Sequence, residues 1–353
     1  MPMRTLRLPD IPYIGRVGLA LVALTVVGFH GMTTRQAAAR AAAVNIRLVR
    51  PGALVVGPRG RLYIADSGRN QILQLLPAGG FTVVAGNGKA GFSGDGGRAS
   101  HAELDQPRGM VIAPNGTLYF ADTGNNRIRA IAADGIISTI AGNGKYGWVR
   151  NGTPARAATL LSPSSVAIGP DRRLYIASAG DNQVLRLETN GAVTQITGNR
   201  HYAGVYGVGH RAVEASPDGP SGLAFDRAGN LFIAGFNTKT LLMITRRGRM
   251  VLPMGLDGFY PRGAGGLVTG PNGHVIAMNG QSIVRLGTRG ARTILDLSQR
   301  RIDGITGFLP NGLAVAPDGT IFTDTFAGNG YTSKTAVLKI SPGGHIQVLW
   351  KSL

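Results

Sequence analysis

Apolar residues between positions 106 and 144 form four short runs separated by turn-forming residues. The runs are Gly109–Ala113, Leu118–Ala121, Ile128–Ile131 and Ile136–Ala141. The segments between them are rich in Gly, Asn, Asp and Pro, which favour tight turns because they tolerate or preset the backbone angles that turns need. Four strands in so short a stretch, joined by tight turns, predict an antiparallel meander.

This unit recurs along the chain. Copies of its second strand are Arg61–Asp66, Thr117–Asp122, Arg173–Ser178, Gly229–Ala234, Gly273–Met278 and Gly319–Asp324. In the last copy the aspartate comes one residue early, as if a residue had been lost from the turn or strand. A repeat of this length cannot bury its apolar faces alone and stacks on its neighbours. We therefore predict an all-β, six-bladed β-propeller with four antiparallel strands per blade, forming one domain over residues 44–353.

Polar residues that follow the second strands are assigned a structural role. Asp66 and Asp122 are placed to accept backbone N–H bonds at the turn into the third strand, and Asn70 and Asn126 fit the same task. The sequence alone leaves two ways in which the ring of blades could close. Residues 346–349 supply an outer strand for the sixth unit, while residues 44–49 either add to a sheet edge or only lead into the first blade.

Residues 1–43 have the pattern of a targeting segment. A basic stretch precedes the uncharged apolar run Val17–Phe29, and Ala-rich sites follow at 37–39 and 41–43. A basic region, a short apolar region and a small-residue exit are typical of secretory signals. The run is short for a spanning helix, which needs about 20 apolar residues. We predict export to the periplasm, the cell surface or the medium, with either cleavage or retention as an N-terminal membrane anchor.

Composition narrows the chemistry. The chain has no cysteine, so disulfides, thiolate metal sites and cysteine nucleophiles are excluded. Its net charge of +19 comes almost entirely from arginine. Such an excess suits nucleic acid or another anionic polymer, but charges in the blade-to-blade connections nearly balance. A phosphate-tracking surface concentrates charge on one face, so nucleic-acid binding is the third-ranked interpretation, and contact with a membrane is expected only through the N-terminal segment.

Two motifs carry a family resemblance. Asp122–Arg129 (DTGNNRIR) and Gly91–Gly97 (GFSGDGG) resemble the bacterial NHL repeat, a β-propeller module. The resemblance covers about residues 51–349 and is strongest in the first three units. It implies a six-bladed propeller. It does not fix an activity, because similar propellers bind proteins or RNA, form sensor ectodomains or act as enzymes.

Long connections between blades are the expected place for function. In a four-stranded blade they emerge at the same end as the turns between second and third strands, and loops on a rigid scaffold commonly carry binding residues. They contain aromatic residues that either form a ligand surface or pack as plugs between blades. These ligand-surface candidates are Phe92, Tyr146, Trp148, Tyr202, Tyr206, Phe259 and Tyr260.

Metal-assisted chemistry is a weaker possibility. His101, His201 and His210 lie in the connections, and three histidines can hold Zn²⁺. The resemblance also extends to lactonase-type propellers, which bind a divalent cation at the axial entrance. Asn311 matches their motif, and Asp218 lies at a comparable entrance. The glutamate that such enzymes carry in the first blade has no counterpart in residues 50–54, which removes a ligand that a hard cation needs.

These observations predict a non-catalytic module that binds a protein or small ligand on its loop-rich face. It is expected to be monomeric and to need no cofactor. The alternative is a Ca²⁺- or Zn²⁺-dependent lactonase, other hydrolase or lyase on the same propeller.

Overall fold

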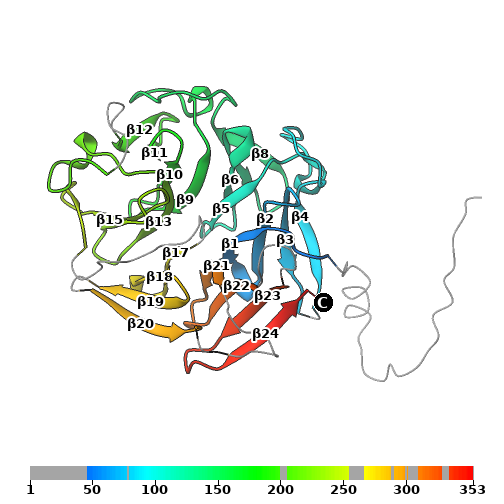
Figure 1. The fold of residues 1–353 in the computed structure, drawn as a ribbon. Coiled ribbons are helices and arrows are strands. Elements are labelled where there is room, and N and C mark those ends of the chain that lie inside the picture. Colours follow the sequence, from blue (N-terminus) through cyan, green and yellow to red (C-terminus); the bar gives the residue numbers. More distant parts are fainter. Residues whose placement is uncertain are drawn as a thin grey trace, which may run out of the picture.

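The structure is a computed structural model in which six four-stranded antiparallel sheets surround a central axis (Figure 1). It describes residues 46–77, 79–198, 205–253, 266–287, 290–298, 300, 309–327 and 334–352. Each sheet consists of four strands that follow one another in the sequence. The predicted six-bladed propeller is therefore confirmed. In the described part of the chain no helix is long and apolar enough to span a membrane.

The first three blades match the sequence pattern closely. Their strands are β1 (Pro51–Val56), β2 (Leu62–Asp66), β3 (Gln71–Leu75) and β4 (Phe81–Ala85); β5 (Pro107–Ile112), β6 (Leu118–Asp122), β7 (Arg127–Ile131) and β8 (Ile137–Ala141); and β9 (Pro163–Ile168), β10 (Leu174–Ser178), β11 (Gln183–Leu187) and β12 (Val193–Thr197). The four runs read from the sequence coincide with β5 to β8 to within a few residues at each end.

The last three blades have the same order but less even strand lengths. They contain β13 (Pro220–Phe225), β14 (Leu231–Gly235), β15 (Leu241–Ile244) and β16 (Met250–Val251); β17 (Leu267–Thr269), β18 (Val275–Asn279), β19 (Ser282–Gly287) and β20 (Gly290–Asp296); and β21 (Leu309–Val315), β22 (Ile321–Ala327), β23 (Lys334–Ile340) and β24 (Ile346–Lys351). Short 3-10 turns lie at Pro58–Gly60, Ala99–His101, Thr123–Asn125, Ala155–Ala157, Ala212–Glu214 and Pro271–Gly273.

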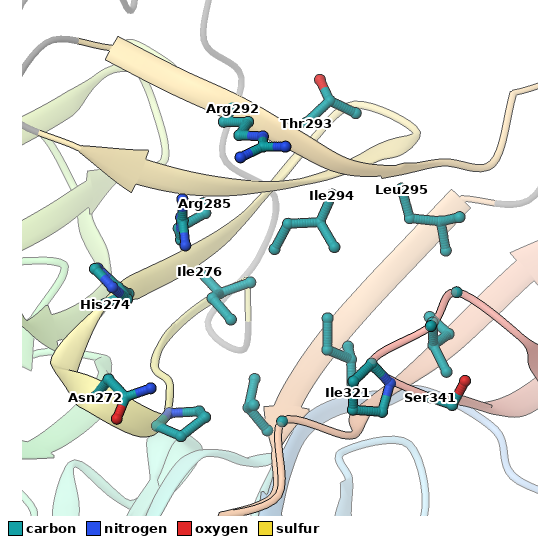
Figure 2. A pocket seen from close by; sticks show the side chains of 17 residues that line it. Asn272, His274, Ile276, Arg285, Arg292, Thr293, Ile294, Leu295, Ile321 and Ser341 are labelled. Carbon is teal, nitrogen blue, oxygen red and sulfur yellow. The ribbon is translucent and has the colours of Figure 1, made fainter.

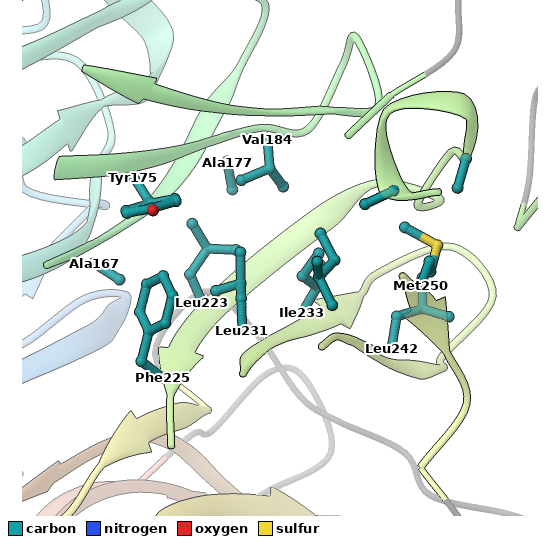
Figure 3. Packing of buried hydrophobic residues seen from close by; sticks show 13 residues of the cluster. Ala167, Tyr175, Ala177, Val184, Leu223, Phe225, Leu231, Ile233, Leu242 and Met250 are labelled. Carbon is teal, nitrogen blue, oxygen red and sulfur yellow. The ribbon is translucent and has the colours of Figure 1, made fainter. Parts of the chain in front are cut away.

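The core lies between blades rather than within one. Between blades 3 and 4, Tyr175 and Ala177 of one sheet pack against Leu223, Phe225 and Ile233 of the next (Figure 3). A two-sided sheet buries both faces in this way because each blade is covered by its two neighbours. Apolar burial stabilises by roughly 25 cal/mol per Å² removed from water, so these layers hold the ring together.

Glycine allows the innermost strands to approach one another. A Cβ atom added at Gly109 would lie 2.5 Å from the Cα atom of Ser165 in the next blade. At Gly312 it would lie 2.3 Å from the carbonyl oxygen of Gly52. Neither distance is possible for a real side chain, so the close approach of the innermost strands requires glycine at both positions.

The ring closes by packing, with no strand shared between blades among the described residues. Strand β24 pairs with β23 in the sixth sheet, as the sequence allowed. Ile46 and Leu48, which precede β1, form no strand but are buried against Phe322 and Val337 of blade 6. Of the two possibilities for this segment, the described residues 46–49 fit the lead-in into the first blade.

The sixth blade has lost no residue, and that expectation was wrong. Val315 pairs with Ile321 just as Ile112 pairs with Leu118, so the first hairpin has the usual length. Asp324 pairs with Gly312, one position earlier than the aspartate of blade 2. The chain therefore keeps its register while the aspartate moves to the other side of the strand, because successive side chains alternate between faces.

The blade-to-blade connections also form hydrogen bonds with the outer strand of the next blade. In the first, the backbone of Gly96 donates to Ile137 of the next blade's outer strand, and Ala99 donates to Gly135. The next two connections repeat this, with isolated bridges from Pro154 to Ala192 and from Arg211 to Arg249. Each of these three connections thus runs along the outer edge of the following blade. An exposed strand edge is prone to unwanted pairing, and these segments cover it.

Candidate functional site

Aspartates at the ends of second strands organise the side of the propeller where the connections emerge. Asp66 accepts hydrogen bonds from the backbone N–H groups of Val49 (2.9 Å) and Arg50 (2.8 Å). Asp122 accepts one from Asp105 (2.8 Å). Both carboxylates are fully buried. The structural role predicted for these residues is confirmed, because their oxygens fix the chain where it enters the first and second blades.

The third blade performs the same task with a different residue. Ser178 stands where the first two blades have aspartate, and Asp181 replaces the missing carboxylate by accepting from the backbone of Leu161 (2.9 Å) and from the Ser178 hydroxyl (3.0 Å). Burial raises the pKa of Asp181 from 3.8 to about 6. Burial likewise raises the pKa of Asp122 to about 6, although the Asp105 N–H, Asn125 and Arg129 all oppose it.

Asparagines fasten each of the first two blades to the next one. Asn70 accepts from the backbone of Gln106 (2.9 Å), and Asn126 accepts from Ser162 (2.9 Å) one blade further on. Gln106 and Ser162 both have positive φ, as do the two asparagines. Asparagine tolerates this left-handed conformation better than most residues. The predicted turn role of Asn70 and Asn126 is confirmed, and it extends across the blade boundary.

A buried arginine ties the first connection to the second blade. Arg129 donates to the Asp95 carboxylate (2.8 Å) and to the backbone oxygens of Ser93 (2.8 Å) and Glu103 (3.0 Å). Phe92 lies over the guanidinium of Arg127, whose central carbon is 3.7 Å from the ring centroid. The two conspicuous motifs, GFSGDGG and DTGNNRIR, are therefore in contact and act on each other as scaffold.

The aromatic candidates are placed differently from one another. Tyr146 is 76% exposed and Tyr206 45%, whereas Trp148 is half-buried. Phe92, at 41% exposure, has one ring face on Arg127 and is thus partly a plug. Tyr202, Phe259 and Tyr260 lie outside the described residues. Most other large exposed apolar side chains also lie in or beside connecting segments, namely Val49, Val208, Val213, Phe236 and Leu252.

The metal candidates are engaged in local bonds or stand apart. Asn311 donates to the carbonyl oxygen of Pro51 (2.5 Å), and Asp218 accepts from Asn237 (2.9 Å). His101 and His210 are exposed in separate connections, and His201 lies outside the described residues. Within the described ranges no three His, Asp or Glu residues are grouped so that they could hold a metal ion.

Asp324 is a buried carboxylate at the junction of blades 6 and 1. It accepts from the backbone N–H of Gly312 (2.6 Å). Burial raises the pKa of Asp324 to about 6; the Gly312 N–H and Asn311 oppose the shift, and nearby Asp66 adds to it. Asp66 also has a raised pKa, caused by burial. Asp66 and Asp324 lie close together, and both carboxylates accept hydrogen bonds from backbone N–H groups. Their role at the junction of blades 6 and 1 is therefore structural.

Two cavities are lined by residues from more than one blade. One of about 240 Å³ lies on the axis and is lined by the innermost strands of all six blades, with mostly apolar side chains. Another, of about 490 Å³, lies between blades 5 and 6 and carries His274, Arg285 and Arg292 (Figure 2). This second site is not predicted from the sequence. Its signal is the absence of any acidic residue between Asp257 and Asp296.

Comparison with known proteins agrees with this architecture. The family model "Teneurin NHL domain" matches residues 77–246. This chain is an NHL-repeat propeller. Teneurin-3 of Danio rerio is 29% identical to it over 52% of this chain and 8% of its own length. NHL repeat-containing protein 2 of Gallus gallus is 33% identical over 56% of this chain and 30% of its own length. The NHL propeller thus spans less than a third of these relatives.

Similarity to solved structures supports only the fold of this NHL propeller. A putative gluconolactonase has a TM-score of 0.54 at 16% identity, over 88% of this chain and 95% of its own. Virginiamycin B lyase from Staphylococcus aureus has a TM-score of 0.52 at 14% identity, over 87% and 86%. At these identities a shared propeller carries no statement about activity.

Proposed function

We propose that this NHL propeller is an exported, non-catalytic binding module that engages a protein partner through its connection side. The observation that carries this proposal is that the residues on that side fall into two groups, one bonded to the backbone and one exposed to solvent. Asp66, Asp122 and Asn126 are bound to backbone groups, while Tyr146 and Tyr206 lie exposed in the second and third connections on the same side. Rigid scaffolds that present exposed aromatic side chains are typical of binding surfaces, where aromatics supply much of the affinity.

The relatives support a module rather than a self-contained enzyme. In the teneurins the similar region is 6–8% of a much longer chain, so it is one part of a larger protein. The N-terminal pattern of residues 1–43 supports export, with membrane contact confined to that segment. The polymer-binding interpretation of the net charge ranks lower, since acidic and basic residues nearly balance in the connections.

Partner capture tests the proposal. The full-length chain with Tyr146 intact is compared with Tyr146→Ser, and with Arg247→Ser as a matched control in a turn on the opposite side. We expect one defined protein to be retained by the first and third and lost at least tenfold from the second, a loss typical of an interface aromatic. Equal retention by all three would contradict binding through the connection side.

Metal analysis separates the module from the metal-dependent alternative. The purified chain is dialysed against Ca²⁺ and Zn²⁺, and bound metal is measured for the wild type, Asn311→Ala and Asp218→Ala. We expect no stoichiometric metal in any of them. One equivalent that is lost in either variant would overturn the non-catalytic proposal in favour of a metal-assisted hydrolase.

A further inference from the structure

The groove between blades 5 and 6 lies on the side of the propeller opposite the connections. It is bordered by the turn Pro271–Gly273, between first and second strands, and by the turn after Ile340, between third and fourth strands. Its floor is apolar, with Ile276 and Ile294 of blade 5 facing Ile321 of blade 6 (Figure 2). A volume of about 490 Å³ is in the range of small-molecule sites, roughly 300–1,000 Å³.

Comparison with blades 3 and 4 shows why the groove is open. There, Tyr175 and Phe225 fill the corresponding space with an edge-to-face ring contact, their centroids 4.8 Å apart. By strand register, Ile276 occupies the position of Tyr175, and Val315 that of Phe225. Two aliphatic side chains replace two aromatic rings. The space between the blades is consequently not filled by the protein.

The same comparison explains the charge. In blade 3, Arg186 is neutralised by Glu188 (2.8 Å) and lies 3.5 Å from the Asp171 carboxylate. Across the sheet it faces Thr194, which is uncharged. The arginine of this blade is therefore an ordinary member of a surface ion-pair network.

In blade 5 every one of these partners has changed. Arg285 occupies the position of Arg186 and faces Arg292 across the sheet. Asn272 stands in place of Asp171, and Gly287 in place of Glu188. In the described part of the chain neither arginine forms an ion pair. Like charges directly opposite each other on two strands destabilise a sheet, so an anion held between them would relieve a cost built into the blade.

We propose that this groove binds a small amphiphilic anion, with its aliphatic body on the isoleucine floor and its carboxylate or phosphate head on Arg285 and Arg292. Arginine forms bidentate, charge-assisted hydrogen bonds with both head groups. His274, exposed at the rim, adds a polar group beside them. Ile294, which lines the groove, is 44% exposed and is therefore accessible to the aliphatic body of a ligand.

Calorimetric titration of the full-length chain tests the ligand class. Decanoate and decyl phosphate share the proposed chemistry, and comparing them distinguishes a carboxylate from a phosphate source. Decanol and decyltrimethylammonium keep the aliphatic body but lack the negative charge. We expect saturable one-to-one binding of at least one anion, and binding of both controls at least tenfold weaker. Absence of saturable binding by either anion, or equal binding of decanol, would overturn the proposal.

Variants of the groove test its location. Arg285→Gln and Arg292→Gln are each expected to weaken binding of the anion by roughly tenfold, the loss of one charge-assisted hydrogen bond. Arg61→Gln, an exposed arginine in the equivalent turn region of blade 1, should leave binding unchanged. Ile276→Phe restores bulk where blade 3 has Tyr175 and should abolish binding while unfolding stays cooperative. Unchanged binding in both arginine variants would place the ligand elsewhere.

Discussion

Arg129 and Asp95 form an ion pair between two blades, with Nη2 of the arginine 2.8 Å from Oδ1 of the carboxylate. Arg129 belongs to strand β7 of blade 2, whereas Asp95 lies in the connection that arrives from blade 1. The arginine side chain has no exposed surface. It also approaches the buried carboxylate of Asp122 to 3.5 Å. A single cation thus compensates two acids and fixes a long segment to the scaffold.

Removing this cation is expected to destabilise the propeller strongly. Arg129→Met leaves Asp122 buried without its charged partner, and breaking a buried pair in this way costs about 3–5 kcal/mol. Arg127→Met is a suitable comparison because Arg127 is only partly buried. It would lose its stacking on Phe92, about 1 kcal/mol, and its hydrogen bonds to the backbone oxygens of Asn125 and Asn143. Urea unfolding at pH 7 measures both. Equal, small effects would mean that the ion pair does not hold the connection.

Asp324 should give the propeller a measurable pH dependence. Its pKa is raised to about 6 in the folded chain and returns to its ordinary value of 3.8 on unfolding. The folded state therefore binds this proton more tightly, and its contribution to stability is complete below pH 4 and lost as pH rises through 6. About two pKa units correspond to roughly 3 kcal/mol.

The variant Asp324→Asn isolates that contribution. The amide oxygen can still accept from Gly312, but the side chain no longer titrates. We expect the difference in unfolding free energy between wild type and variant to shift in favour of the variant as pH rises from 4 to 7. A difference that stays constant over this interval would show that Asp324 does not titrate there.

The interblade clamp made by Asn126 can be separated into two effects. Asn126→Gly keeps the left-handed backbone (φ 51°) but removes the acceptor for Ser162, while Asn126→Ala removes the acceptor and adds backbone strain. We expect a loss of about 1–2 kcal/mol for Gly and about 1 kcal/mol more for Ala. Asn126→Asp, which retains an acceptor, should be the mildest. Thermal unfolding compares the three, and Gly equal to wild type would exclude the hydrogen bond as a contributor.

Much of the fold could be predicted because the same pattern of four strands and turns recurs several times along the chain. The alternation of apolar runs and turn residues located β5 to β8, and Asp122 and Asn126 were assigned their structural tasks from turn chemistry alone. The sixth blade was harder because Asp324 moves by one position while the register stays fixed, and the sequence alone does not show which of the two has shifted.

The groove between blades 5 and 6 was not predicted because it arises where blade 5 lacks an aromatic ring and an acidic residue that blade 3 has. Ile276 and Gly287 are unremarkable residues in a strand, and they matter only beside Tyr175 and Glu188 at the same positions of blade 3. Such a comparison needs a strand register. The connection-side candidates, in contrast, were found easily because aromatic residues in Gly-rich loops are conspicuous, although Phe92 then proved to stack on an arginine.

Site-specific photo-crosslinking in the producing cells tests the central claim most directly. A photoreactive phenylalanine is placed at Tyr146 and Tyr206 on the connection side, and at Arg247 in an exposed turn on the opposite side. The account predicts a crosslink to one defined protein from the first two positions and none to that protein from the third. A crosslink to the same protein only from position 247, or no crosslinked protein from any position, would contradict a partner-binding connection side.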